Sequence, residues 1–166
     1  MLNPHRVCAD FQDDLVIFLI GMRINQFYAI HRWWPVARAM PAMLQELRQQ
    51  PELGFLHAEM WFGRTIILLQ YWRSLEDLLA YAHSREAQHL PAWQRFNQAS
   101  ASQKNRTSVG IWHETYQVKQ AEFESIYVNM PLFGLARAAG GVLPATGRHA
   151  HAAGRLRSAQ TRKDKI

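Results

Sequence analysis

The residues of this sequence best suited to chemistry lie side by side in one short apolar stretch. Residues 109–118 read VGIWHETYQV, with His113 next to Glu114 among aromatic and branched side chains. A neutral imidazole, with an ordinary pKa of about 6.5, is the natural proton acceptor near neutral pH. A buried glutamate needs a partner or a raised pKa. We therefore take His113 and Glu114 as candidate catalytic residues, with His113 as the proton acceptor.

The spacing of these two residues limits how they can act together. Side chains alternate along a strand, so His113 and Glu114 face opposite sides of a sheet unless a bulge intervenes. The alternative interpretation is structural. In that case His113 is a hydrogen-bonded core histidine, and Glu114 pairs with an arginine such as Arg73 or Arg95. The sequence leaves both interpretations open.

Three further polar residues are candidates for a site. Asn129 is a third catalytic candidate, because its amide could hydrogen-bond a carbonyl, although a strand end or turn could also explain it. His57 and Glu59 share a strand face by their spacing, which could form a second cavity wall. A metal site would need a third ligand that this spacing does not supply, so we predict none.

Aromatic residues are more numerous than a small core needs, and six of them are tryptophans. They could line an apolar pocket for a flat, ring-bearing ligand, or they could fill the core and a dimer interface. The residues that we assign to a candidate substrate pocket are Trp61, Trp93, Phe96, Trp112 and Tyr116.

The hydrophobic pattern predicts the elements that must position these residues. Strands are predicted at 15–25, 52–63, 64–73, 108–118 and 123–130, and helices at 32–50, from Ser74 and from Pro91. Ser74 and Asp77 have the spacing of a helix N-cap. The order βαββαβ with an extra strand is that of an α+β, ferredoxin-like fold, with both helices on one face of an antiparallel sheet.

The second face of this sheet also needs a cover, because large apolar side chains occur in both alternating sets of strand residues. By alternation, one face of the second strand carries Phe55, His57, Glu59 and Trp61, and the other Leu56, Ala58, Met60 and Phe62. One set meets the helices. We expect the other to meet the same sheet of a second copy, which gives a homodimeric α+β barrel.

Length and charge indicate one globular domain with two flanking segments. We assign residues 1–14 to an N-terminal extension, 15–138 to the barrel domain and 139–166 to a disordered basic tail. Lys/Arg and Asp/Glu number 13 and 12 in residues 1–138, but 6 and 1 in residues 139–166. The tail is either solvated or binds RNA or an anionic membrane, whereas no nucleic acid is expected for the near-neutral domain.

Cysteine content and hydropathy bear on location. Cys8 is the only cysteine, which excludes an intrachain disulfide and fits a reducing compartment. The N-terminus lacks the pattern of a signal peptide, and the longest apolar run, 15–22, is far short of the ~20 residues of a spanning helix. We therefore expect a cytoplasmic protein without a transmembrane segment.

Four segments together resemble a known family. They are YWRSLEDLLAYA (71–82), HLPAWQRFN (89–97), VGIWHETYQV (109–118) and ESIYVNMPLFGLARA (124–138). They are similar to small monooxygenase-like proteins related to the antibiotic-biosynthesis monooxygenases, a group with a member in fumagillin biosynthesis. The resemblance covers roughly residues 15–138 and implies a dimeric α+β barrel.

The same resemblance implies an oxygenase mechanism without metal or flavin. In monooxygenases of the related type, the substrate activates oxygen itself once it has lost a proton. That chemistry needs a base, a water-poor pocket and a group that steadies the anion. His113 would be the base, and Asn129, Tyr116 or Trp112 would position the substrate.

A second resemblance involves haem. The order HLPAWQRF, WHETY and YVNMPLFG is similar to the C-terminal half of the haem-containing aldoxime dehydratases, which are about twice as long. In those enzymes a helix histidine binds the haem iron and a strand histidine acts on the substrate. The resemblance implies that His89 would be the axial ligand and His113 the distal residue.

Three functions follow from these observations. The first is a cofactor-independent monooxygenase-like enzyme that acts on a small apolar or aromatic metabolite, as in secondary metabolism. The second is a haem-binding dehydratase- or oxygenase-like protein with His89 as axial ligand. The third is a non-catalytic protein that binds a lipophilic ligand or serves in a stress response.

Overall fold

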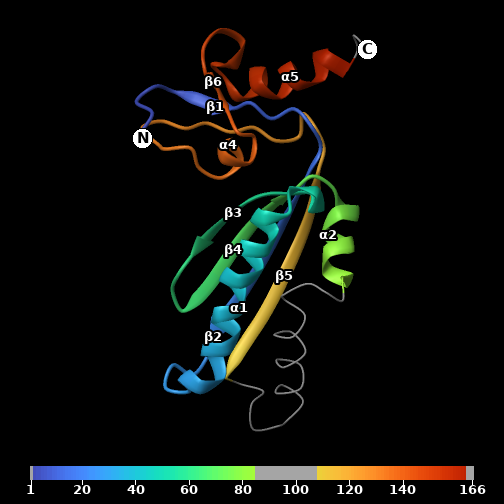
Figure 1. The fold of residues 1–166 in the computed structure, drawn as a ribbon. Helices are drawn as coiled ribbons and strands as arrows, with labels where there is room; N and C mark the ends of the chain where they lie inside the picture. Colours follow the sequence, from blue (N-terminus) through green and yellow to red (C-terminus); the bar gives the residue numbers. More distant parts are fainter. Residues whose placement is uncertain (1, 85–107, 164–166) are drawn as a thin grey trace.

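The structure, a computed structural model, describes residues 2–84 and 108–163 of the chain (Figure 1). The elements follow one another as β1 (Val7–Ala9), β2 (Leu15–Ile24), α1 (Ile30–Gln49), η1 (Pro51–Leu53), β3 (Phe55–Trp61), β4 (Thr65–Trp72), α2 (Leu75–His83), β5 (Val109–Val118), α4 (Leu135–Ala138), β6 (Val142–Pro144), η2 (Gly147–His149) and α5 (Ala152–Lys163).

Four strands form an antiparallel sheet in the order β3-β4-β2-β5. The first of them along the chain, β2, lies in the middle and pairs with the last, β5, which is the ferredoxin-like arrangement. Side chains of α1 and α2 pack in one cluster against the same face of this sheet. The α+β, ferredoxin-like prediction is therefore confirmed. Within one chain the sheet is open, so the dimeric barrel stays a prediction.

The core on the helix side explains why this face is stable. Leu68 and Trp72 of β4 are fully buried there, together with Leu44 and Leu47 of α1. Each fully buried side chain of this size contributes about 1.5–3 kcal/mol relative to an exposed one. The central strands thus need their helix cover, and their residues alternate between the covered face and the open one.

The capping signal and the strand limits were readable from sequence. The hydroxyl oxygen of Ser74 accepts a hydrogen bond of 3.1 Å from the backbone N–H of Asp77, which confirms the start of α2. Strand β5 spans Val109–Val118, within the range predicted for it. The helix predicted from Pro91 lies outside the described residues.

A bulge in β3 alters the predicted faces. The pairing of β3 with β4 shifts between Phe55 and His57. Phe55 packs in the helix-side core with Ala58, whereas Leu56 packs on the other side of the sheet with Tyr71. The prediction that Phe55 shares a face with His57 is wrong, because the extra residue inverts the alternation at this point.

The strand predicted at 123–130 is also wrong. The segment makes only isolated bridges, Asn3 with Met130 and Val7 with Tyr127. Beyond the second bridge, the hydroxyl of Ser125 accepts the backbone N–H of Ala9 at 3.0 Å, a bond that a strand backbone would otherwise make. A side chain that replaces a backbone group as the hydrogen-bond partner interrupts the pairing of the two strands.

The C-terminal segment contains regular structure where we predicted disorder for 139–166. Strand β6 pairs with β1, with Cys8 opposite Leu143 (Figure 1). Arg155 of α5 forms an ion pair of 2.6 Å with Glu124. These contacts join residues far apart in the sequence, so local composition does not reveal them. The boundaries of the 15–138 domain stay a prediction.

Gly21 of β2 lies opposite Trp112 of β5, and the indole ring occupies the space where a side chain would be. We expect Gly21→Ala to displace this ring and to lower the free energy of unfolding by about 1–3 kcal/mol. Urea denaturation followed by tryptophan fluorescence measures the change. Gly63→Ala is the matched control, because a Cβ there meets only the Thr65 carbonyl, at 3.7 Å. Equal losses in both variants would contradict this packing.

Candidate active site

The register of β5 decides which way its two ionisable residues point. His113 lies opposite Ile20 of β2, and Glu114 lies opposite Leu19, with continuous pairing along the strand. Ile20 packs against the helix-side core. His113 therefore lies on the helix-facing side, and Glu114 on the open side, as the alternation predicted. The two side chains cannot act in one cavity of a single chain.

His113 lies exposed on an edge strand among apolar neighbours. Its imidazole ring contacts the ring of Phe18, with centroids 5.8 Å apart and planes inclined by 44°. Across the sheet, His113 pairs with Ile20 of β2, which in turn pairs with the fully buried Leu68 of β4. Neither ring nitrogen has a hydrogen-bond partner in residues 2–84 and 108–163. His113 is therefore not a buried residue of the described core, and its role as the proton acceptor stays a prediction.

Gln70 adds a hydrogen-bond donor to the same face of the sheet, in the row that contains Phe18. Its side-chain oxygen accepts the Trp72 indole N–H at 2.8 Å. Its amide nitrogen is buried and lacks a partner in the described part of the chain. An unpaired buried donor costs about 1–3 kcal/mol, so a bound oxygen atom would be stabilised there. Our sequence reasoning missed Gln70, although a glutamine inside the apolar run TIILLQYW was a usable signal.

The open face carries Glu114, whose carboxylate accepts the Tyr116 hydroxyl at 2.6 Å. This hydrogen bond and the carboxylate charge raise the pKa of the Tyr116 phenol, because both favour its neutral form. The alternative pairing of Glu114 with Arg73 is wrong, since Arg73 binds Asp77 at 2.9 Å. Arg95 lies outside the described residues.

Three rows of paired residues cross the four strands on this open face. Each runs from β3 through β4 and β2 to β5: Trp61, Ile67, Gly21 and Trp112; Glu59, Leu69, Leu19 and Glu114; His57, Tyr71, Ile17 and Tyr116. The centre is apolar, and the carboxylates lie at the two edges. Three residues of the predicted pocket, Trp61, Trp112 and Tyr116, therefore share a face, but it is the face opposite His113.

His57 and Glu59 tie the loop before α4 to this sheet. The imidazole Nε2 of His57 lies 3.0 Å from Glu59 Oε1, which also accepts the Gly134 backbone N–H at 3.0 Å. Tyr127 accepts the backbone N–H of Ala136 at 3.2 Å. The described residues contain no group of three or more His, Cys, Asp or Glu that could hold a metal ion. The arrangement serves as an anchor for the chain.

Tyr71 is the most perturbed group of this anchor, and sequence reasoning missed it. Burial, followed by the influence of Tyr127 and Glu59, raises the pKa of the Tyr71 phenol to about 12. A hydrogen bond from the Leu135 backbone opposes this shift but does not cancel it. Tyr71 therefore stays neutral throughout the physiological range and holds the start of α4 as a hydrogen-bonding group.

The remaining predicted site residues divide into two sets. Asn129 lies exposed in the loop before α4, with a φ of 53°, a conformation that asparagine tolerates better than most residues. Its catalytic role stays a prediction. His89, Trp93 and Phe96 lie outside the described residues. No helix in the described ranges is long and apolar enough to span a bilayer.

Comparison with known proteins gives a family and a shared fold. A family model described as monooxygenase af470-like matches residues 15–135. Monooxygenase af470 of Aspergillus fumigatus is 30% identical over 126 residues, which cover 70% of this chain and 43% of that protein. Both findings agree with the resemblance to a monooxygenase-like family seen in the sequence.

Solved structures show related folds. Aldoxime dehydratase OxdRE, in complex with butyraldoxime, superposes with a TM-score of 0.65 at 19% identity, over 81% of this chain and 40% of that one. SnoaB of Streptomyces nogalater, a cofactor-independent oxygenase, gives a TM-score of 0.44 at 14% identity, over 64% of this chain and 95% of that one. The chain spans less than half the length of the fungal monooxygenase and of the dehydratase.

The raised pKa of Tyr71 predicts a loss of stability in base. The unfolded phenol ionises near pH 10, whereas the folded one stays neutral to about 12. Stability is thus fully present below about pH 10 and falls as the pH rises towards 12. Tyr71→Phe should weaken this dependence, of which the raised pKa of the Tyr81 phenol keeps a part, and should cost about 1–3 kcal/mol, because the Leu135 N–H loses its acceptor.

Urea denaturation at several pH values measures both effects, and Tyr116→Phe is the matched control. Tyr116 is an exposed phenol, so its replacement should leave stability nearly unchanged. A Tyr71→Phe variant as stable as the parent would show that the anchor contributes nothing.

Proposed function

Because this chain belongs to the monooxygenase af470-like family, we propose that it is a monooxygenase-like enzyme that acts on a small apolar or aromatic metabolite. One observation within the chain supports the proposal most. His113 presents an imidazole without a hydrogen-bond partner in the described residues, on the helix-facing side of the sheet, beside Phe18. A base at an apolar surface is what oxygen activation by the substrate itself requires.

The proposed reaction needs no flavin or metal. The imidazole of His113 removes a proton from an acidic CH₂ or from the hydroxyl of a phenol. The resulting anion gives electrons to O₂ and forms a substrate peroxide. Loss of water from the peroxide converts the CH₂, or the ring C–H carbon of the phenol, to C=O, so one oxygen atom enters the product and the other leaves as water. The substrate supplies all the electrons.

In the proposed reaction, Gln70 is the group that would stabilise the substrate anion by a hydrogen bond. Its unpaired amide N–H lies on the same sheet face as His113, in the adjacent row. A buried donor aimed at developing negative charge is worth more than the same donor in water, because it is already oriented. Glu114 is on the other face and takes no part in this step within one chain.

The open face supports a homodimer as part of the proposal. Ile17 and Leu69 already pack in one cluster with Leu135 of α4, so the part available to a second copy is Leu19 and Ile67 with the exposed rings of Trp61 and Tyr116 at the edges. A contiguous apolar sheet face is a typical contact between two copies of one chain. Pairing of two such faces would close the barrel and protect each sheet from water.

The base assignment predicts the effect of a single substitution. His113→Ala should lower the rate of oxygen consumption with an electron-rich phenol by about 100-fold or more, as the loss of a general base does. An oxygen electrode measures the rate. His5→Ala is the matched control, because His5 is an exposed histidine of the N-terminal segment and should leave the rate unchanged.

Two outcomes would contradict this assignment. Full activity in His113→Ala would exclude the imidazole as the base. A protein that retains a lipophilic metabolite but never consumes oxygen would instead indicate the non-catalytic, ligand-binding function.

The fold shared with aldoxime dehydratases favours one alternative, a haem-binding protein. When bound, haem iron would bind the substrate and polarise it as a Lewis acid. His113 lies on the helix-facing side of the sheet, which agrees with a role next to the substrate. The residue that would hold the haem iron is His89, which lies outside the described residues.

Native mass spectrometry with an absorbance spectrum tests the cofactor and the dimer together. For protein purified from its own host, we expect a colourless dimer. A Soret band at about 400 nm that His89→Ala abolishes and His113→Ala retains would establish haem instead. A monomer at micromolar concentration would contradict the closed barrel.

A further inference from the structure

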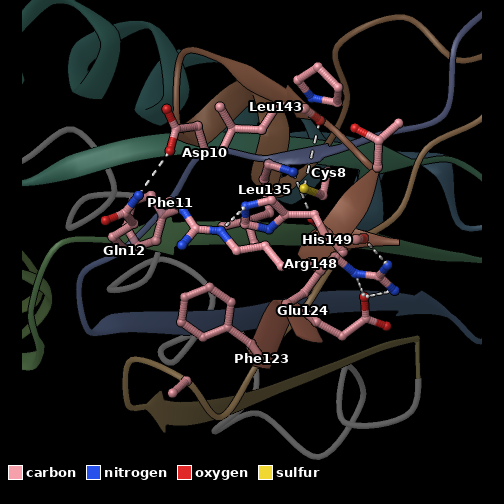
Figure 2. Close-up of a pocket in the computed structure, with 16 residues that line it drawn as sticks. Cys8, Asp10, Phe11, Gln12, Phe123, Glu124, Leu135, Leu143, Arg148 and His149 are labelled. Atoms are coloured by element: carbon pink, nitrogen blue, oxygen red, sulfur yellow. Dashed lines mark hydrogen bonds and ion pairs between the residues drawn. The ribbon is translucent and has the colours of Figure 1, made fainter. Parts of the chain in front are cut away.

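A separate cavity lies between the two ends of the described chain, and its lining contains no residue of the four-stranded sheet (Figure 2). Its volume is approximately 400 Å³, within the range of small-molecule sites. The wall is built from β1 and the residues that follow it, from the loop 121–125, from α4 and from the C-terminal segment between β6 and α5. None of the residues assigned to the oxygenase reaction lines it.

One part of the cavity is apolar. The rings of Phe11 and Phe123 lie with centroids 6.0 Å apart at an angle of 53°. Leu135 and Leu143 contribute branched side chains to the same wall. A tilted aromatic pair flanked by leucines suits the body of a hydrocarbon or a single aromatic ring.

The polar part of the cavity has two arginines in different states. Arg155 is 7% exposed, forms an ion pair with Glu124 at 2.6 Å and donates to the His149 carbonyl at 2.8 Å. Its charge is therefore compensated, and it holds α5 in place. Arg148 donates from Nε to His149 Nε2 at 3.2 Å and forms no ion pair within the described ranges. Figure 2 shows His149 beside it.

The hydrogen bond from Arg148 also fixes how His149 can act. An imidazole nitrogen that accepts a hydrogen bond is unprotonated, so the neutral ring carries its proton on the other nitrogen. The pair therefore offers donors only, from the remaining guanidinium N–H groups and from His149 Nδ1. Such a set recognises an acceptor with negative charge.

We propose that this cavity binds a small organic monocarboxylate with an apolar or aromatic body. The carboxylate pairs with Arg148, whose planar guanidinium matches its geometry. The body lies between Phe11, Phe123 and the two leucines. A dianion such as phosphate fits less well, because Asp10 and Glu124 also line the cavity and would repel the second charge. The guanidinium of Arg148 can pair with one carboxylate, and Asp10 in the same wall disfavours any further negative charge.

Calorimetry with two matched probes tests the proposal independently of any oxygenase activity. The full chain should bind 3-phenylpropionate and bind 3-phenylpropionamide at least about 10-fold more weakly, because the amide lacks the charge. Arg148→Gln should weaken binding of the acid by about 10-fold or more and leave the amide unchanged. Arg157→Gln is the matched control, an exposed arginine of α5 that does not line the cavity.

Leucine methyl NMR locates the bound probe and reports whether each variant is folded. Resonances of Leu135 and Leu143 should shift on addition of the acid, whereas those of Leu44 and Leu47 in the helix-side core should not. The proposal is overturned if the acid does not bind at millimolar concentration or binds no better than the amide. Unchanged affinity in a folded Arg148→Gln variant, or shifts confined to Leu44 and Leu47, would overturn it as well.

Discussion

The pairing of β2 with β4 on one side and β5 on the other is the constraint on which the rest of the structure depends. It runs along nearly the whole of Leu15–Ile24 and fixes the face of every residue in three strands. A slip by one residue would exchange all these faces, so the apolar residues that α1 and α2 cover hold the register in place. The position of His113 beside Phe18 is a direct consequence.

The same register gives the two faces of the sheet different chemical properties. The helix-facing side combines an accessible imidazole, an aromatic ring and the buried amide of Gln70, whose nitrogen has no partner in the described residues. The open side has an apolar centre and is fastened to the loop before α4 through Glu59 and Tyr71. Groups suited to react with a small molecule thus lie on one face, and groups suited to packing lie on the other.

The two ends of the chain form a second centre of organisation. The short strands β1 and β6 pair across more than a hundred residues of sequence, and the Arg155–Glu124 ion pair fixes α5 beside them. A cavity remains between these segments, lined by residues from both ends of the described chain. Arg155 and Glu124 compensate each other, and Arg148 and Asp10 also line the cavity without an ion pair in the described ranges, so the donors of Arg148 set its preference for an acceptor.

Features set by neighbouring residues were determined by the sequence alone. Alternation placed His113 and Glu114 on opposite faces, the βαββαβ order specified the sheet, and Ser74 marked the start of α2, because each depends on residues a few positions apart. Tertiary structure decided the rest. The bulge at Phe55, the order in the C-terminal segment and the unpaired amide of Gln70 depend on which distant backbone and side-chain groups meet. Those contacts depend on the packing of the whole chain, so no local sequence pattern predicts them.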